Sequence, residues 1–251
     1  MPSRKRTDGV ICVHADYEAL SRAAAELFLR QAKEATEDHG RFSVALSGGS
    51  TPQRAYELLA GPPFNTQVDW GRVHVFWSDE RCVPPNDPRS NARMAREKLL
   101  DHVPVPPGHV HPIACAGSAE NAARSYESLL RSFFDGGPKS FDLVFLGLGT
   151  DGHTASLFPG TPALLEKDRW VTEIYSEKEA IHRVTLTAPI LNQALVLAFI
   201  ASGASKAVVL REVLTQRPGP ERFPARLIKP DCYGGKLYWL VDKNSASLLE
   251  T

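Results

Sequence analysis

The chain of 251 residues has few cysteines and no long apolar segment. Its 4 cysteines form no CxxC pair and no Cys/His cluster at zinc spacing, so we expect free thiols in a reducing compartment at Cys12, Cys82, Cys115 and Cys232. The apolar run 195–201 is far shorter than the roughly 18 to 20 residues that cross a bilayer. Residues 1–9 are polar and lack the apolar core of a signal peptide. We therefore expect a cytoplasmic protein without a membrane partner.

Several charge and motif signatures are also missing. Lys plus Arg equals Asp plus Glu at 29 each, so the overall charge gives no bias toward nucleic acid. There is no GxxxxGK[ST] and no GxGxxG that opens a helix, which argues against ATP and dinucleotides. No serine lies in GxSxG and no cysteine has a histidine beside it, so a covalent acyl-enzyme is not indicated. What remains is a small-molecule site of another kind.

Strand and helix patterns alternate along the chain. This alternation predicts an α/β fold, a doubly wound and mostly parallel sheet with helices on both faces. We expect a single domain over residues 1–251, with 1–9 as a flexible lead, 78–89 as a loop and 216–224 as a Pro-rich surface loop. The expected helices are 16–39, one carrying 55–59, 91–100, 119–134 and 205–215, and the expected strands are 42–46, 73–77, 141–146, 170–175, 183–187, 195–200 and 237–241.

Ligands of open parallel sheets bind beyond the carboxyl ends of the strands, so the loops that follow these strands should face one crevice. The first loop, SGGSTP at 47–52, places Gly48, Gly49 and Ser50 at a helix N-terminus, where free N–H groups attract an anion. The same letters also describe an ordinary tight turn. This loop is therefore a candidate phosphate cradle.

Basic side chains follow other strands of the predicted sheet. In SDER at 78–81, Arg81 can bind a phosphate bidentately while Asp79 or Glu80 holds the guanidinium in place. A local ion pair at the strand end is the alternative. Arg183 in RVTLT and Lys206 in SGASK are further candidates, although most lysines at such places are merely solvated. Together they predict an anion handle at the sheet edge.

The segment 141–160, FDLVFLGLGTDGHTASLFPG, delivers His153 onto a glycine-rich loop directly after a buried strand. With an unperturbed pKa of about 6.5, histidine is the natural proton acceptor near neutral pH. Asp151 is close enough in sequence to orient or charge-stabilise the imidazole. We predict His153 as a general base, with a structural histidine as the alternative.

Taken in order, these loops resemble those of the 6-phosphogluconolactonase family, from about residue 10 to 248. The resemblance rests on ALSGGSTP, FWSDERCVPPNDPRSN, GLGTDGHTASLFPG, RVTLT, SGASK and LYWLVD. It implies a Rossmann-like fold shared with glucosamine-6-phosphate deaminases, no cofactor and no metal. The implied activity is hydrolysis of 6-phospho-D-glucono-1,5-lactone, a sugar-phosphate lactone, to 6-phosphogluconate in the pentose phosphate pathway.

Carried over by motif, the resemblance makes His153 the base that takes a proton from water, with Asp151 beside it. Arg81 and Lys206 match phosphate-binding positions, Arg183 and Asp79 belong to the same site, and Gly48, Gly49 and Ser50 would line the substrate loop. We expect a monomer or weak homodimer with no nucleic-acid partner.

Two alternatives stay open. A deaminase or isomerase shares the glycine loop and the DGH motif, but its pattern carries an acidic residue after the histidine, and residues 154–160 contain no carboxylate. A non-catalytic sugar-phosphate binder would be expected to have lost the base, and His153 is present.

Overall fold

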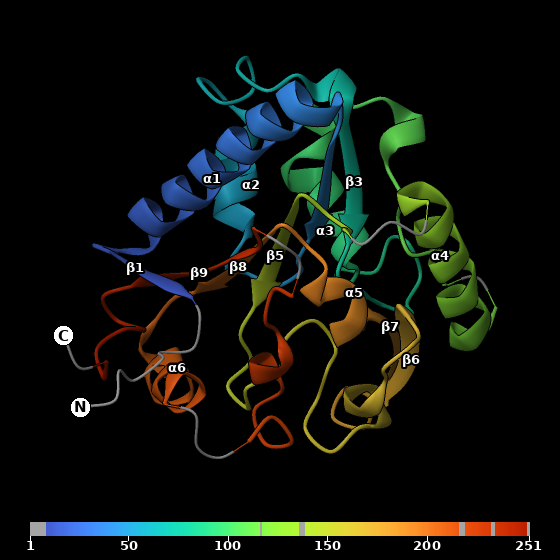
Figure 1. The fold of residues 1–251 in the computed structure, drawn as a ribbon, viewed down its shortest axis with the longest axis vertical. Coiled ribbons are helices and arrows are strands. Elements are labelled where there is room, and N and C mark those ends of the chain that lie inside the picture. Colours follow the sequence, from blue (N-terminus) through green and yellow to red (C-terminus); the bar gives the residue numbers. More distant parts are fainter. Residues whose placement is uncertain (1–8, 116, 136–138, 216–218, 232–233, 250–251) are drawn as a thin grey trace.

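A computed structural model describes residues 9–115, 117–135, 139–215, 219–231 and 234–249. Its central element is a six-stranded sheet in the order β1-β9-β8-β5-β2-β3, in which every neighbouring pair is parallel (Figure 1). The inner strands β2 and β8 are buried along their whole length, which explains their mainly apolar sequences. The strands are β1 (Val10–His14), β2 (Phe42–Leu46), β3 (Val73–Trp77), β5 (Leu143–Gly147), β8 (Val196–Ala201) and β9 (Lys236–Asp242).

Helices cover both faces of this sheet. Phe28 of α1 packs against Phe42 of β2, whereas Phe76 of β3 packs against Phe133 of α4. Phe76 is in register with Ala45, and side chains alternate along a strand, so Phe42 and Phe76 point to opposite faces. The mostly parallel α/β fold is thus confirmed. The helices are α1 (Tyr17–His39), α2 (Gln53–Ala60), α3 (Asn91–Lys98), α4 (Ala119–Phe134), α5 (Ala188–Asn192) and α6 (Ala207–Leu214).

A second, antiparallel sheet of three strands was not predicted. It has the order β4-β7-β6, with β4 at Asp79–Arg81, β7 at Ile181–Leu186 and β6 at Val171–Ser176. The prediction of 78–89 as loop throughout is therefore wrong at its start. Three residues are too short for a pattern, and β4 exists because β7 supplies its partner hydrogen bonds.

Two other expectations need correction. No strand was expected at β1, a short edge strand whose Val10 and Val13 side chains are exposed and whose pairing partner β9 lies at the other end of the sequence. The loop 216–224 is at the surface at residues 220–222, as expected, but Phe223 and Pro224 at its end are buried. Residues 216–218 of that loop, and residues 1–8 of the expected lead, lie outside the described residues.

The expectation of free thiols is wrong for one pair. Cys82 and Cys115 form a disulfide with a Cα–Cα distance of 5.1 Å, while Cys12 is free and Cys232 lies outside the described residues. The pair is 33 residues apart in sequence, so spacing alone gave no signal. A parallel bridge between Val75 and Val110 brings the segment after Val110 alongside β3, and this places Cys115 beside the end of β4.

Three histidines cluster beside β3. The ring of His74 stacks on His109 with 3.9 Å between centroids, and its Nδ1 lies 3.3 Å from Nε2 of His111. Burial, together with the neighbouring His109, His111 and Arg41, lowers the pKa of His74 to about 4. Since an unfolded histidine titrates near about 6.5, folding opposes protonation here. The contribution of neutral His74 to stability is therefore fully present above about pH 6.5 and is lost as the pH falls toward 4.

We expect His74→Phe to reduce this acid destabilisation, because phenylalanine keeps the ring stack and removes the titrating group. The check is the urea midpoint of unfolding at pH 7 and pH 5, which should fall less for the variant than for the unchanged protein. His102→Phe, at an exposed histidine, is the control and should retain the full difference. Equal losses for His74→Phe and the unchanged protein would contradict the prediction.

Candidate active site

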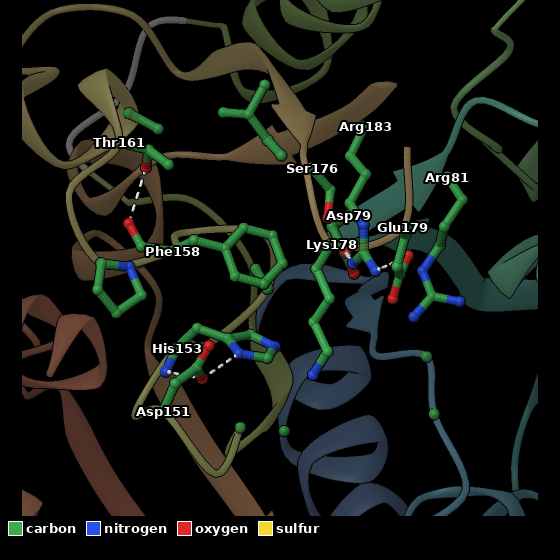
Figure 2. Close-up of a pocket in the computed structure, with 18 of the residues that line it drawn as sticks. Asp79, Arg81, Asp151, His153, Phe158, Thr161, Ser176, Lys178, Glu179 and Arg183 are labelled. Atoms are coloured by element: carbon green, nitrogen blue, oxygen red, sulfur yellow. Dashed lines mark hydrogen bonds and ion pairs between the residues drawn. The ribbon is translucent and has the colours of Figure 1, made fainter. Parts of the chain in front are cut away.

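The loops at the carboxyl ends of the parallel strands enclose one cavity of about 1010 Å³. Strand ends of β2, β3, β5 and β8 meet there, together with the small antiparallel sheet (Figure 2). Every residue that the sequence assigned to the site lines this cavity: Gly48, Gly49, Ser50, Asp79, Arg81, Asp151, His153, Arg183 and Lys206. The parallel topology thus brings the predicted residues together.

The loop after β5 is a tight turn that returns on itself. Gly149 N–H donates to the His153 carbonyl at 2.8 Å, and Gly152 N–H donates to the Gly149 carbonyl at 3.0 Å. Gly149 is required by space, since a Cβ there would lie 2.0 Å from His153 Nδ1. Gly152 has a φ of +80° and packs against Phe223 of the Pro-rich loop. The turn therefore sets the position of the imidazole.

His153 and Asp151 form a pair at one end of the cavity. His153 Nδ1 and Asp151 Oδ1 are 2.5 Å apart, and the backbone N–H of His153 donates to the same oxygen at 3.1 Å. Burial raises the pKa of Asp151, but the hydrogen bonds and charge of His153 outweigh it and bring the value to about 2. An ionised Asp151 only accepts, so Nδ1 carries the proton and Nε2 keeps its lone pair. Phe158 packs against the imidazole, with centroids 4.4 Å apart.

Asp79 and Arg183 lie in a buried polar network. Ser156 Oγ donates to Asp79 Oδ2 at 2.5 Å, Arg183 Nη1 lies 3.4 Å from the same oxygen, and Asn91 Nδ2 donates to Asp79 Oδ1 at 3.1 Å. The contacts join β4, the start of α3 and the loop after β5 to β7. Asp79 is therefore bound on both oxygens, and it holds Arg183 at the cavity wall.

Arg81 is held differently from the sequence prediction. Its Nη1 donates to the Arg89 carbonyl at 2.7 Å, and its Nε is buried with no acceptor among the described residues. Glu80 turns away and accepts from the backbone N–H groups of Asn91 and Ala92 at the start of α3. Burial raises the pKa of Glu80, and these bonds partly offset it. The prediction that Asp79 or Glu80 holds the guanidinium is therefore wrong.

The glycine loop before α2 fits closely against its neighbours. A Cβ on Gly48 would lie 1.9 Å from Asn91 Oδ1, and Gly49 has a φ of +90°, where glycine is favoured. The Tyr17 hydroxyl donates to the carbonyls of Ser50 and Thr51. The loop is thus fixed at the N-terminal end of α2, beside the cavity.

Lys206 also lines the cavity, in the short turn after β8 (Ala204–Lys206). Asp242 at the end of β9 holds this turn, because it accepts from Ser202 Oγ at 2.5 Å and from the Gly203 N–H at 3.1 Å. Burial lowers the pKa of Lys206, and the charge of Asp151 partly offsets it. The ammonium is therefore close enough to the His153 end to interact with Asp151.

Sequence reasoning missed residues that complete the site. Asn91 ends the motif FWSDERCVPPNDPRSN and Ser156 is part of GLGTDGHTASLFPG, but their contacts with Asp79 form only in the folded chain. Lys178 and Glu179 come from the turn between β6 and β7, and both line the cavity (Figure 2). The sequence did not single out Lys178 and Glu179, since two charged residues in a turn are most often simply exposed to solvent.

Two other kinds of site find no support in the described residues. No group of three or more His, Cys, Asp or Glu side chains there is arranged to hold a metal ion. None of the described helices has the length and apolar character needed to span a bilayer.

Comparisons with known proteins agree with the motifs and the fold. Residues 15–239 match the family model of glucosamine-6-phosphate isomerases/6-phosphogluconolactonase. The 6-phosphogluconolactonase of Synechocystis sp. is 42% identical over 220 residues, covering 86% of this chain and 88% of that protein. The probable 6-phosphogluconolactonase 1 of Arabidopsis thaliana is 38% identical over 255 residues, covering 96% and 94%.

Among solved structures, the 6-phosphogluconolactonase from Trypanosoma brucei superposes with a TM-score of 0.84 at 31% identity. The superposition covers 97% of this chain and 100% of that one. The chain therefore belongs to the family of glucosamine-6-phosphate isomerases and 6-phosphogluconolactonases.

Proposed function

We propose that the protein hydrolyses 6-phospho-D-glucono-1,5-lactone to 6-phospho-D-gluconate, with His153 as the general base. The observation that carries the proposal is the pairing of His153 with an ionised Asp151 in a cavity that also holds Arg81, Arg183 and Lys206. The names of the relatives, given above, point to the same substrate. Hydrolysis of a phosphorylated lactone requires a general base and cationic side chains that bind the phosphate, and both lie within this one cavity.

In the proposed reaction, Nε2 of His153 takes a proton from water as the water oxygen attacks the lactone carbonyl. The carboxylate of Asp151 stabilises the imidazolium that forms. The imidazolium then gives its proton to the ring oxygen as the carbon–oxygen bond breaks, which leaves a carboxylic acid and a free hydroxyl. Backbone N–H groups in the glycine loop at Gly48 and Gly49 would stabilise the developing oxyanion.

The phosphate would lie away from the reacting carbon, on the cationic side of the cavity. Arg81 is suited to this, since its guanidinium is steadied by the Arg89 carbonyl and its side chain lines the cavity. Lys206 and Arg183 add positive charge to the walls. Holding the phosphate also orients the carbonyl toward His153, so the same contacts bind the substrate and position it.

The direct test compares hydrolysis of freshly prepared 6-phosphogluconolactone with and without protein, followed by the proton released. A rate above the spontaneous one supports the proposal, and an unchanged rate contradicts it. Unphosphorylated gluconolactone is the matched substrate and should react far more slowly. This comparison separates a phosphate-guided lactonase from an unspecific esterase.

The alternative enzyme is a glucosamine-6-phosphate deaminase, for which release of ammonia from glucosamine 6-phosphate is the assay. Against it, Phe158 packs on the imidazole and residues 154–160 place no carboxylate beside His153. A non-catalytic sugar-phosphate binder would bind 6-phosphogluconate without accelerating hydrolysis. The two assays together discriminate among the three functions.

We expect Arg81→Ala to raise KM for the phosphorylated lactone by about ten- to a hundredfold, the loss typical of hydrogen bonds to a charged group. The value of kcat should change much less, since Arg183 and Lys206 remain in the cavity and can keep the bound substrate oriented. Steady-state kinetics check this. Arg89→Ala is the control, because it keeps the carbonyl that holds Arg81 and removes only a side chain paired with Asp87. A loss confined to kcat would contradict the assignment of Arg81.

A further inference from the structure

The turn between β6 and β7, residues 177–180, carries two charged side chains to the cavity. In Figure 2, Lys178 extends down into the cavity and the carboxylate of Glu179 faces the guanidinium of Arg183. Glu179 Oε2 accepts from Arg183 Nη2 at 2.5 Å. The Glu179 carboxylate is therefore bound to Arg183, a cationic side chain of the site that is proposed to bind a phosphate.

The contacts of Arg183 divide into a buried set and one that faces the cavity. Nη1 is bound by Asp79 and Ser156, and both of those side chains are buried. Glu179 is on the accessible side, with 38% of its side chain exposed against 4% for Arg183. A ligand that reaches Arg183 from the cavity must therefore meet Nη2, where Glu179 is.

Arg81 lies beside Arg183, and the two guanidinium groups form a cationic wall of the cavity, the Arg81–Arg183 wall. Arg81 and Arg183 are directly opposite each other in the β4–β7 register, so their side chains leave the same face of the sheet. Burial raises the pKa of Glu179, but hydrogen bonding and charge from Arg183, with the charge of Arg81, lower it overall. Glu179 is thus ionised at neutral pH and lies in the field of both guanidinium groups.

We propose that Glu179 is an internal competitor for the phosphate of the substrate, a specificity-determining residue that sets how tightly the Arg81–Arg183 wall binds a phosphate. The inference rests on the proposed function of this cavity as a sugar-phosphate site. A phosphate monoester has a charge of about −1.5 to −2 at pH 7 and three acceptor oxygens, so it can displace a single carboxylate from a guanidinium.

The size of the effect follows from occupancy. When the binding-competent form is a fraction of the molecules, the apparent Kd rises by the inverse of that fraction. Because the Glu179 partner is accessible to solvent, this pair is screened, and solvent-screened ion pairs form with free energies of only a few tenths to about one kilocalorie per mole, which corresponds to roughly two- to fivefold. Removal of the Glu179 charge should therefore tighten phosphate binding by about two- to fivefold.

The test measures binding of inorganic phosphate and of 6-phosphogluconate by titration calorimetry to the unchanged protein, Glu179→Gln and Glu177→Gln. Glu177 is the matched control: it is on the same turn, lines the same cavity, and its carboxylate makes no hydrogen bond or ion pair within the described residues. We expect Glu179→Gln to tighten binding of both ligands by about two- to fivefold and Glu177→Gln to change it by less. Glu179→Ala provides a second variant.

Weaker or unchanged binding in both Glu179 variants overturns the inference, as does an equal gain in Glu177→Gln, which would indicate a general charge effect. Hydrolysis is not part of this readout. Tighter phosphate binding in a protein that does not open the lactone would thus support the role of Glu179 and refute the proposed function.

Discussion

His153→Ala is expected to lower kcat for lactone hydrolysis by about 10²- to 10⁴-fold, the range that general-base assistance supplies. The reason is geometric as well as chemical. Asp151 accepts from Nδ1, which leaves Nε2 as a proton acceptor, and alanine removes this group without filling its place. The rate of proton release from fresh lactone, corrected for spontaneous opening, measures the loss.

The matched control is His182→Ala. His182 also lines the cavity, but it is on β7, where its ring contacts Tyr175 with centroids 5.0 Å apart. It has no acidic partner among its described contacts and should not act on water. We expect His182→Ala to keep kcat within about twofold. Similar losses in the two variants would mean that the cavity needs a histidine for its shape or charge.

Two further measurements make the result specific to a base. The variant should bind 6-phosphogluconate with nearly unchanged affinity, since Arg81 and Arg183, the proposed phosphate-binding residues, lie away from His153 (Figure 2). Its residual rate should also lose the rise with pH that a general base gives the unchanged protein. A variant that retained full kcat would rule out the proposed mechanism.

The parallel sheet could be predicted because its inner strands leave a strong signal in the sequence. The inner strand β2 and its edge neighbour β3 were predicted with the bounds that the structure has, since both are short, mainly apolar and mostly buried runs flanked by turn residues. Helix α4 was also predicted with the bounds that the structure has, and in the structure the Ser118 side chain caps its N-terminus. Strand β1 has neither signal, because it is at the sheet edge and depends on β9 for its hydrogen bonds.

The location of the site was predictable for a related reason. Parallel strands align their carboxyl ends, so loops that are far apart in sequence must meet, and the candidate residues line one cavity as a result. Their partners were not predictable. Which carboxylate pairs with Arg183, and which acceptor holds Arg81, depends on the antiparallel β4–β7 pairing. The disulfide between Cys82 and Cys115 depends on tertiary contacts in the same way.

The loop that carries His153 gives the second large prediction. Gly149→Ala is expected to reduce kcat almost as far as His153→Ala, although residue 149 bears no reacting group. An added Cβ would lie 2.0 Å from His153 Nδ1 and 2.6 Å from Asp151 Oδ1, well inside van der Waals contact. The backbone around it is fixed by the bond from Gly149 N–H to the His153 carbonyl. The imidazole must therefore turn away from Asp151.

The cost should appear in catalysis more than in stability. The atoms in conflict belong to side chains at the cavity, which can move, so we expect destabilisation of no more than about 1–3 kcal/mol, or several degrees in Tm. Gly147→Ala, two residues earlier, is the control because its Cβ would meet only Ser47 Oγ at an ordinary 3.6 Å. It should keep most of the activity. Kinetics and thermal unfolding of both variants provide the comparison.

A double-mutant cycle shows whether Gly149 acts through His153. In the His153→Ala background the imidazole is gone, so adding Gly149→Ala should lower kcat by less than about twofold further. If the two losses instead multiplied, the glycine would be acting on substrate or fold by another route. The non-additive result would mean that the space beside Gly149 is kept empty so that Asp151 can hold the base in line with the water.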